Sequence, residues 1–310
     1  MIRAVVDVGS NSVLLTVAEK VGEGWRTVAE ATRVTGLGRG TKQSGVLSEE
    51  AMGDTLQGLR EVFEIARAHG ANEVLAAATM AARIASNTAD FQDRARAQGT
   101  PVDVLSGEDE ASLGFLSVAN DPLFASAARV SIIDPGGHST ELVTADRKHG
   151  GWDVLFRRSY PIGTLGLRGS VLSEESPSLA ARLAAVREID QIIGLEYLPH
   201  QCGTVVTLGA TGTNLITIRE RMTTWQPERV HGQVLDYEEI GRAVGWMFDL
   251  DDAGRAAIVG IEPGREGTVH IGALILERFL FALHGLECAV SVRGWRHALL
   301  EKMGHELAAG

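Results

Sequence analysis

Short apolar runs of strand length alternate along the chain with longer segments in which apolar residues recur at helical spacing. In the first part this pattern predicts strands at 4–7, 12–19, 73–78 and 102–105, and helices at 47–69, 87–98 and 107–119. In the second part it predicts strands at 130–134, 139–145, 152–159 and 204–208, and helices at 178–198, 237–249, 269–284 and 295–308. Such alternation is typical of α/β proteins. The run Asn120-Asp121-Pro122 interrupts it, which predicts an N-terminal domain at 1–122 and a second domain at 123–310, with the last helix (about 295–310) able to pack back on the first.

A short turn pattern occurs twice, once in each predicted domain. The segments Asp7–Ser12 and Asp134–Ser139 each place Asp first, Gly two positions later and Ser five positions later. Each segment also lies between two apolar runs. One such turn would be ordinary hairpin chemistry, because Asp, Asn, Gly and Ser favour turns for local reasons. Two in register indicate two related halves that each present a turn to a shared cleft.

The composition of these turns suits a phosphate. Glycine lets the backbone approach an anion closely, and successive backbone N–H groups in a turn form an anion-binding nest. Asp7 and Asp134 alone would repel phosphate, but a Mg²⁺ ion between them would reverse this, since Mg²⁺ binds through one or two carboxylates plus phosphate oxygens. The alternative is that both aspartates only cap their turns. The candidate phosphate-binding residues of the two turns are Gly9, Ser10, Asn11, Ser12, Gly136, Gly137, His138, Ser139 and Thr140.

The bulk composition narrows the function classes. The 310 residues are 45% hydrophobic and 22% charged, and the net charge of −11 argues against a broad nucleic-acid-binding or anionic membrane-binding surface. Cys202 and Cys288 lie far apart, outside any metal-ligand spacing, and are expected to be buried, reduced thiols. No apolar stretch has the form of a signal peptide or a membrane span, so we expect a cytoplasmic protein that binds neither nucleic acid nor membrane.

Six segments give the chain a family resemblance. It resembles the exopolyphosphatase / guanosine pentaphosphate phosphatase family, in its short two-domain form, within the actin-like ATPase superfamily. The resemblance implies two related actin-like (ribonuclease H-like) α/β domains flanking a central cleft. It also implies a divalent cofactor, Mg²⁺ or Mn²⁺, held by Asp7, Asp134 and Glu141. The segments that carry it are 6–12, 78–87, 105–111, 134–142, 160–163 and 209–213, in the order of the family.

The resemblance assigns a catalytic role to Glu110. In this family a glutamate of the segment matching residues 105–111 acts as general base on the attacking water, and Glu110 is the position directly before the alanine. A structural reading of the same segment is available, because Ser106 with Asp109 three residues later forms a capping box at a helix start. Acidic residues in a first turn also favour the helix dipole, and such a carboxylate would be ionised at neutral pH, as a base must be.

Other residues of the matching segments are candidates for phosphate contacts. Arg83 follows a predicted strand, and its guanidinium offers a fork of donors that fits phosphate oxygens; the alternative is a surface ion pair. Gly209, Thr211 and Thr213 lie in a glycine-rich turn that matches the nucleoside-side loop of the superfamily. A plain strand-to-helix connection is the alternative for that turn.

The second turn departs from the pattern of the family. Pro135 stands where an apolar residue is usual, and His138 stands where a third glycine is usual. Proline removes a backbone donor and fixes φ, and His138 must adopt a conformation that glycine reaches easily. These differences bear on substrate choice and rate more than on reaction class.

The resemblance favours Mg²⁺-dependent release of terminal orthophosphate from inorganic polyphosphate. Guanosine pentaphosphate is the alternative substrate, and a non-catalytic regulator that binds polyphosphate or guanosine nucleotides is the alternative class. A small-molecule kinase of the same superfamily is disfavoured by the segment 106–111, and an actin-like filament protein by the lack of evident insertions. A homodimer is compatible with all of these readings.

Overall fold

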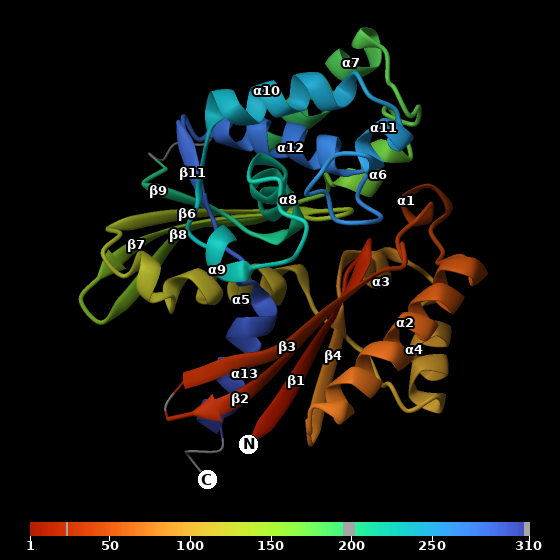
Figure 1. The fold of residues 1–310 in the computed structure, drawn as a ribbon, viewed down its shortest axis with the longest axis vertical. Coiled ribbons are helices and arrows are strands. Elements are labelled where there is room, and N and C mark those ends of the chain that lie inside the picture. The colour runs from red at the N-terminus through yellow and green to blue at the C-terminus, as the bar shows by residue number, and fades with distance from the viewer. Residues whose placement is uncertain (23, 195–201, 307–310) are drawn as a thin grey trace. The chain divides into compact units, whose positions relative to one another are not determined.

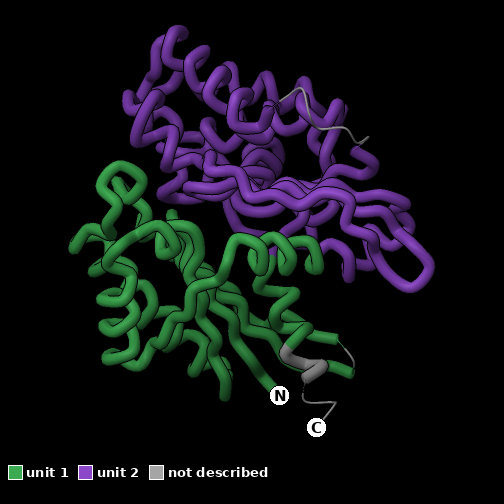
Figure 2. The backbone as a smooth tube through the Cα atoms, turned by 180° about the vertical axis from the view of Figure 1, so that it is seen from behind, with its two compact units in different colours: residues 1–117, 295–310 green, residues 118–294 purple. Residues whose placement is uncertain are grey.

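Two mixed β-sheets form the framework of the computed structural model, which describes residues 1–22, 24–194 and 202–306. The chain divides into two units, and each holds one of the sheets. Unit 1 comprises residues 1–117 together with the C-terminal helix from Trp295, and unit 2 comprises residues 118–294 (Figure 2). The α/β fold class expected from the sequence is thereby confirmed. None of the helices in the described part of the chain is both long enough and apolar enough to cross a bilayer.

Unit 1 is built on a five-stranded sheet of order β3-β2-β1-β4-β5. The first three strands form an antiparallel meander, whereas β4 and β5 run parallel to β1. The first four strands are β1 (Ile2–Val8), β2 (Ser12–Val21), β3 (Gly24–Val34) and β4 (Glu73–Ala78) (Figure 1). The fifth, β5, comprises only Asp103–Val104.

Helices cover both faces of this sheet because side chains alternate along β1. Ala4, Val6 and Val8 pack in a core with Met52 and other apolar residues of α2. Val5 points the opposite way, into a smaller cluster with Trp295 of α13. The helices of unit 1 are α1 (Thr41–Ser44), α2 (Glu49–Ala68), α3 (Met80–Ile84), α4 (Thr88–Ala97), α5 (Gly107–Ala119), which runs on into unit 2, and α13 (Trp295–Glu306).

Unit 2 repeats this arrangement in a six-stranded sheet of order β10-β11-β9-β6-β7-β8. Strands β6, β7 and β8 form the antiparallel meander, and β9 and β11 continue in parallel from β6. The correspondence with β1, β2, β3, β4 and β5 supports the relation between halves that the repeated turn predicts. The strands are β6 (Arg129–Pro135), β7 (Thr140–Lys148), β8 (Gly151–Tyr160), β9 (Thr204–Thr207), β10 (Val234–Asp236) and β11 (Glu287–Val290).

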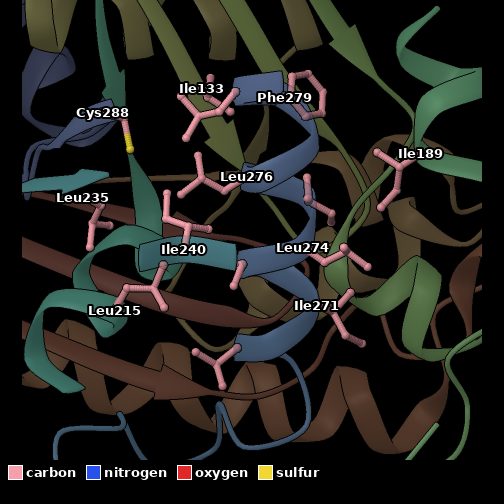
Figure 3. Packing of buried hydrophobic residues seen from close by; sticks show 14 of the residues in the cluster. Ile133, Ile189, Leu215, Leu235, Ile240, Ile271, Leu274, Leu276, Phe279 and Cys288 are labelled. Atoms are coloured by element: carbon pink, nitrogen blue, oxygen red, sulfur yellow. The ribbon is translucent and has the colours of Figure 1, made fainter. Parts of the chain in front are cut away.

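The core of unit 2 surrounds helix α12, which is apolar on nearly all sides. Leu276 and Phe279 of this helix pack toward Ile133 of the sheet, and Ile240 of α10 lies against the same helix (Figure 3). A helix that is apolar all round requires burial on all sides, which the neighbouring helices supply. The helical segments of unit 2 are η1 (Pro122–Phe124), α6 (Thr164–Arg168), α7 (Leu179–Ile193), α8 (Gly209–Arg219), α9 (Pro227–Val230), α10 (Tyr237–Phe248), α11 (Asp252–Ala256) and α12 (Val269–Ala282).

The structure corrects several predicted elements. Strand β3 was not expected, because most of its residues are exposed or half-buried and it lacks a buried apolar alternation. The helix predicted at 87–98 begins at Thr88, and the Asn87 side chain at its N-cap bonds the backbone of Leu47 instead of the helix. The end of the helix predicted at 178–198 lies outside the described residues. Cys288 is buried, whereas Cys202 is partly exposed, so the prediction of two buried thiols holds only for Cys288.

Candidate functional site

The two repeated turns close in the same way. We call Gly9–Ser12 loop 1 and Gly136–Ser139 loop 2. In loop 1 the Gly9 N–H donates to the carbonyl of Ser12 at 2.9 Å, and in loop 2 the Gly136 N–H donates to the carbonyl of Ser139 at 2.8 Å. A Cβ at Gly136 would stand only 2.8 Å from that carbonyl oxygen, and one at Gly9 would stand 3.2 Å from its counterpart. The closing hydrogen bond therefore explains why glycine occupies the same position in both turns.

Loop 1 is held by the segment that follows β3. The N–H groups of Thr35 and Gly36 both donate to the carbonyl of Asn11 at 3.0 Å, and Gly38 donates to the carbonyl of Ser10 at 2.8 Å. These bonds occupy two carbonyl groups of loop 1. The carbonyl oxygens of Ser10 and Asn11 therefore point toward the segment that follows β3.

Three candidate residues of unit 1 follow the carboxyl ends of neighbouring strands. Asp7 lies near the end of β1, Arg83 follows β4, and Glu110 follows β5. The three strands are parallel and adjacent in the sheet. Ligands of open α/β sheets bind outside the carboxyl ends of such strands, and this edge is therefore where a site is expected.

Arg83 and Glu110 form an ion pair at this edge. The Nη1 of Arg83 donates to Oε2 of Glu110 at 2.7 Å and to the carbonyl of Leu105 at 2.9 Å. The side chains are only 16% and 13% exposed. Burial raises the pKa of Glu110 above its ordinary value, and the nearby Arg83 charge opposes this without cancelling it. A carboxylate with a raised pKa beside an arginine suits proton transfer close to neutral pH.

Buried hydrogen-bond donors at the same edge lack a protein acceptor. Among the described residues, Nδ2 of Asn11, Oγ of Ser12 and Nη2 of Arg83 are buried and have no hydrogen-bond partner. Buried polar groups are nearly always paired, and an exception calls for an explanation such as a ligand. Three unpaired groups able to donate, one of them charged, match the oxygen atoms of a phosphate.

Loop 2 is held by the segment after β8. Thr164 N–H donates to the carbonyl of Gly136 at 3.0 Å, and Leu165 N–H donates to that of Gly137 at 2.7 Å. Gly163 lies so close that a Cβ there would stand 2.4 Å from the carbonyl carbon of Gly137. The segment 160–163 was among those that carry the family resemblance, and its structural role is to support loop 2.

Two carboxylates of unit 2 lie opposite each other on adjacent strands. Asp134 of β6 and Glu141 of β7 are direct cross-strand neighbours, which places their side chains on one face of the sheet. Glu141 is 5% exposed and accepts a hydrogen bond from Ser159 at 2.7 Å. Gly209 has a φ of +74° and lies against Asp134, since a Cβ there would stand 2.8 Å from the carboxylate.

This oxygen-donor pair fits a hard divalent cation. Side-chain carboxylates are the donors that Mg²⁺ and Mn²⁺ prefer, and two like charges on one face favour a cation between them. Within the described residues no cluster of three or more His, Cys, Asp or Glu side chains could hold a metal. Mg²⁺ commonly keeps several waters and phosphate oxygens as ligands, so two carboxylates are sufficient for it.

The glycine-rich segment after β9 does not form a loop. It is the first turn of helix α8. Gly209 starts the helix, and Thr211 is buried and packs against Gly272 of α12, where a Cβ would stand 2.3 Å from its hydroxyl. The Thr213 hydroxyl donates back to the carbonyl of Ala210 at 3.2 Å. The sequence pattern suggested a loop because glycine and threonine are poor helix formers. Packing against α12 overrides that preference.

The last two residues of loop 2 and the first residue of β7 are buried. Ser139 is 3% exposed and His138 is 2% exposed, so His138 is enclosed. Thr140 is fully buried, and its hydroxyl donates to the carbonyl of Ile162 at 2.7 Å. Its hydroxyl is therefore engaged within the protein.

One residue near the site was missed at the level of sequence. Arg296, at the start of α13, places its Nη1 3.8 Å from Oδ2 of Asp7. Its Nε donates to the hydroxyl of Thr16 at 3.0 Å. An isolated arginine 289 positions from Asp7 carries no local signal, so only the docking of α13 reveals the contact.

Comparison with known proteins identifies the family of this chain. The sequence profile of the Ppx/GppA phosphatase family matches residues 16–306. Exopolyphosphatase 2 of Mycobacterium tuberculosis is 28% identical over 289 residues, which are 88% of either chain. A solved Ppx/GppA family member from Aquifex aeolicus is 27% identical, with a TM-score of 0.80 over 99% of this chain and 98% of the other.

A further neighbour supports the fold alone. An exopolyphosphatase from Cytophaga hutchinsonii is 21% identical, with a TM-score of 0.87 over 99% of this chain and 98% of the other. The expected fold, family and class of enzyme, a phosphohydrolase, are thus confirmed. With a family match over nearly its whole length, the chain belongs to the Ppx/GppA phosphatase family.

Proposed function

We propose that this protein hydrolyses the terminal phosphoanhydride of inorganic polyphosphate and releases orthophosphate. The observation that carries the proposal is the buried Arg83–Glu110 pair beside donors of loop 1 that lack a protein acceptor. The pair supplies a base and a cation, and the donors supply binding groups for phosphate oxygens. The M. tuberculosis relative named exopolyphosphatase 2 supports polyphosphate as the substrate.

Each residue has a distinct part in the proposed reaction. Glu110 accepts a proton from a water molecule while the water oxygen attacks the terminal phosphorus, and the bond from that phosphorus to the bridging oxygen breaks. Arg83 binds a non-bridging oxygen and keeps Glu110 oriented through its second nitrogen. Ser12 and Asn11 bind oxygens of the same group.

The proposed cofactor is Mg²⁺ or Mn²⁺, held by Asp134 and Glu141. When bound, it would neutralise negative charge on phosphate oxygens. Glu141 is kept in place for this by Ser159.

Phosphate release tests the proposal directly. Polyphosphates of several lengths and guanosine pentaphosphate are compared as substrates with Mg²⁺, without any acceptor molecule. We expect release from polyphosphate, and a loss of about 10²–10⁴-fold in kcat for Glu110→Gln with binding retained. Glu108→Gln, exposed on the same helix, is the matched control and is expected to behave as wild type. Full activity of Glu110→Gln would remove the residue from the mechanism, and release only from guanosine pentaphosphate would replace the substrate.

A further inference from the structure

Helix α13, far from Asp7 along the chain, places the guanidinium of Arg296 beside this aspartate. Trp295, Ala298 and Leu300 of this helix are buried against Val5 and Ala18 of the sheet. These contacts fix the position of the helix on β1 and β2. Arg296 lies between these anchors and is 13% exposed.

The guanidinium of Arg296 bridges the two strands. Its Nε bonds the hydroxyl of Thr16 on β2, which is fully buried, and its Nη1 lies 3.8 Å from the carboxylate of Asp7 on β1. Thr16 pairs with Val5, two residues before Asp7, so both groups lie on the face that α13 covers. The bond to Thr16 fixes the orientation of the arginine fork, which a flexible surface pair would not do.

The two halves of the protein differ at this position. In unit 2 the partner of Asp134 across the strands is Glu141, a second carboxylate. In unit 1 the partner of Asp7 is Leu14, and an arginine stands beside the carboxylate instead. The negative charge is thus doubled in unit 2 and opposed in unit 1.

We propose that Arg296 serves as the built-in cation beside Asp7: it neutralises and positions this carboxylate, so that Asp7 does not hold a divalent ion. This inference rests on the proposed function for its catalytic consequence. Arg296 is a positioning residue in this scheme, since it acts through the carboxylate that it holds.

Binding of Mn²⁺, measured by electron paramagnetic resonance without substrate, tests where the cation binds. Asp7→Asn should leave the affinity for Mn²⁺ within about twofold of wild type, whereas Asp134→Asn should weaken it at least about tenfold. Arg296→Met exposes the Asp7 charge and should create additional or tighter Mn²⁺ binding by about fivefold or more. The double variant Asp7→Asn, Arg296→Met should lose that gain.

Controls separate this role from a structural one. Arg296→Lys keeps the charge and should restore wild-type Mn²⁺ binding, and Arg26→Met removes an exposed arginine of β3 without effect. If Arg296→Met does not fold, as judged by circular dichroism, the Asp7→Asn arm decides alone. Loss of Mn²⁺ affinity in Asp7→Asn, or unchanged Mn²⁺ binding in folded Arg296→Met, would overturn the inference. Because these measurements use no substrate, their outcome does not depend on whether the protein hydrolyses polyphosphate.

Discussion

Acid should destabilise this protein through the buried histidine of α12. His270 of α12 is fully buried, and both of its ring nitrogens lack a hydrogen-bond partner among the described residues. The ring stands edge-on to Phe248 at a centroid distance of 4.7 Å. Burial lowers the pKa of His270 from 6.5 to about 2, and the positive charges of Arg255, Arg168 and Arg182 act in the same direction. The folded protein therefore excludes a proton that the unfolded chain accepts.

The direction and size of the pH effect follow from this difference. Because the folded pKa lies below the unfolded value of 6.5, the stability contributed by neutral His270 is complete above pH 6.5. It is lost as the pH falls from 6.5 toward 2, at about 1.4 kcal/mol per pH unit. At pH 5 the loss is about 2 kcal/mol, a large part of the stability of an ordinary domain.

Replacement by an apolar residue of similar size tests this reasoning. His270→Leu removes the titration, so its free energy of unfolding should fall about 2 kcal/mol less than that of wild type between pH 7.5 and pH 5. At pH 7.5 the variant should be at least as stable, because no unpaired ring nitrogen remains buried. Urea unfolding followed by circular dichroism gives both values, with His149→Gln, an exposed histidine of unit 2, as the control. Equal pH dependence in wild type and His270→Leu would refute the argument.

Two substitutions near the site have expected outcomes of their own. Gly163→Ala puts a methyl group about where the carbonyl of Gly137 stands, so loop 2 must shift; we expect a loss of about 1–3 kcal/mol in stability, seen in thermal unfolding, and slower phosphate release. Ser170→Ala, which removes a hydroxyl at the other end of α6, should leave phosphate release unchanged. Burial raises the pKa of Glu110, and the positive charge of Arg83 lowers it. Arg83→Met removes that charge, so the pKa of Glu110 should rise further. The acid limb of the kcat/KM profile should then move to higher pH, and an unmoved limb would contradict the assignment of that limb to Glu110.

The parts of the site that a sequence can reveal are those made by neighbours in the chain. The closing hydrogen bonds of loops 1 and 2 connect residues three positions apart, so their Gly and Ser pattern is visible as a repeat. Ser48 caps α2, and the N-cap bond from the Ala51 N–H to its hydroxyl is equally local. Such features depend on backbone geometry that a few residues determine together.

The parts that the sequence hides depend on packing between distant elements. Arg296 meets Thr16 only because α13 docks on the first sheet, 280 positions away along the chain. The segment starting at Gly209 becomes helical because Thr211 packs against Gly272. In both cases the decisive contact carries no local signature, and the intrinsic preference of the residues is neutral or opposed.

The segment before Ala111 shows how one stretch of sequence serves structure and chemistry at once. Ser106 accepts a hydrogen bond from the N–H of Asp109 at 3.0 Å and donates to its carboxylate at 2.7 Å, which is the expected cap of α5. Glu110, one residue further and turned by about 100° around the helix, is therefore free of capping and reaches Arg83 instead.

The helix dipole and burial have opposite effects on the ionisation of Glu110. The helix dipole at the start of α5 favours the ionised form of an acid in its first turn, typically by about 0.3–1 kcal/mol. Burial acts against ionisation of Glu110 and prevails even over the Arg83 charge, so the pKa is raised. A carboxyl group governed only by the dipole and Arg83 would be a weaker base. The enclosure of Glu110, more than its place on the helix, thus gives this carboxylate the proton affinity that a base for water requires.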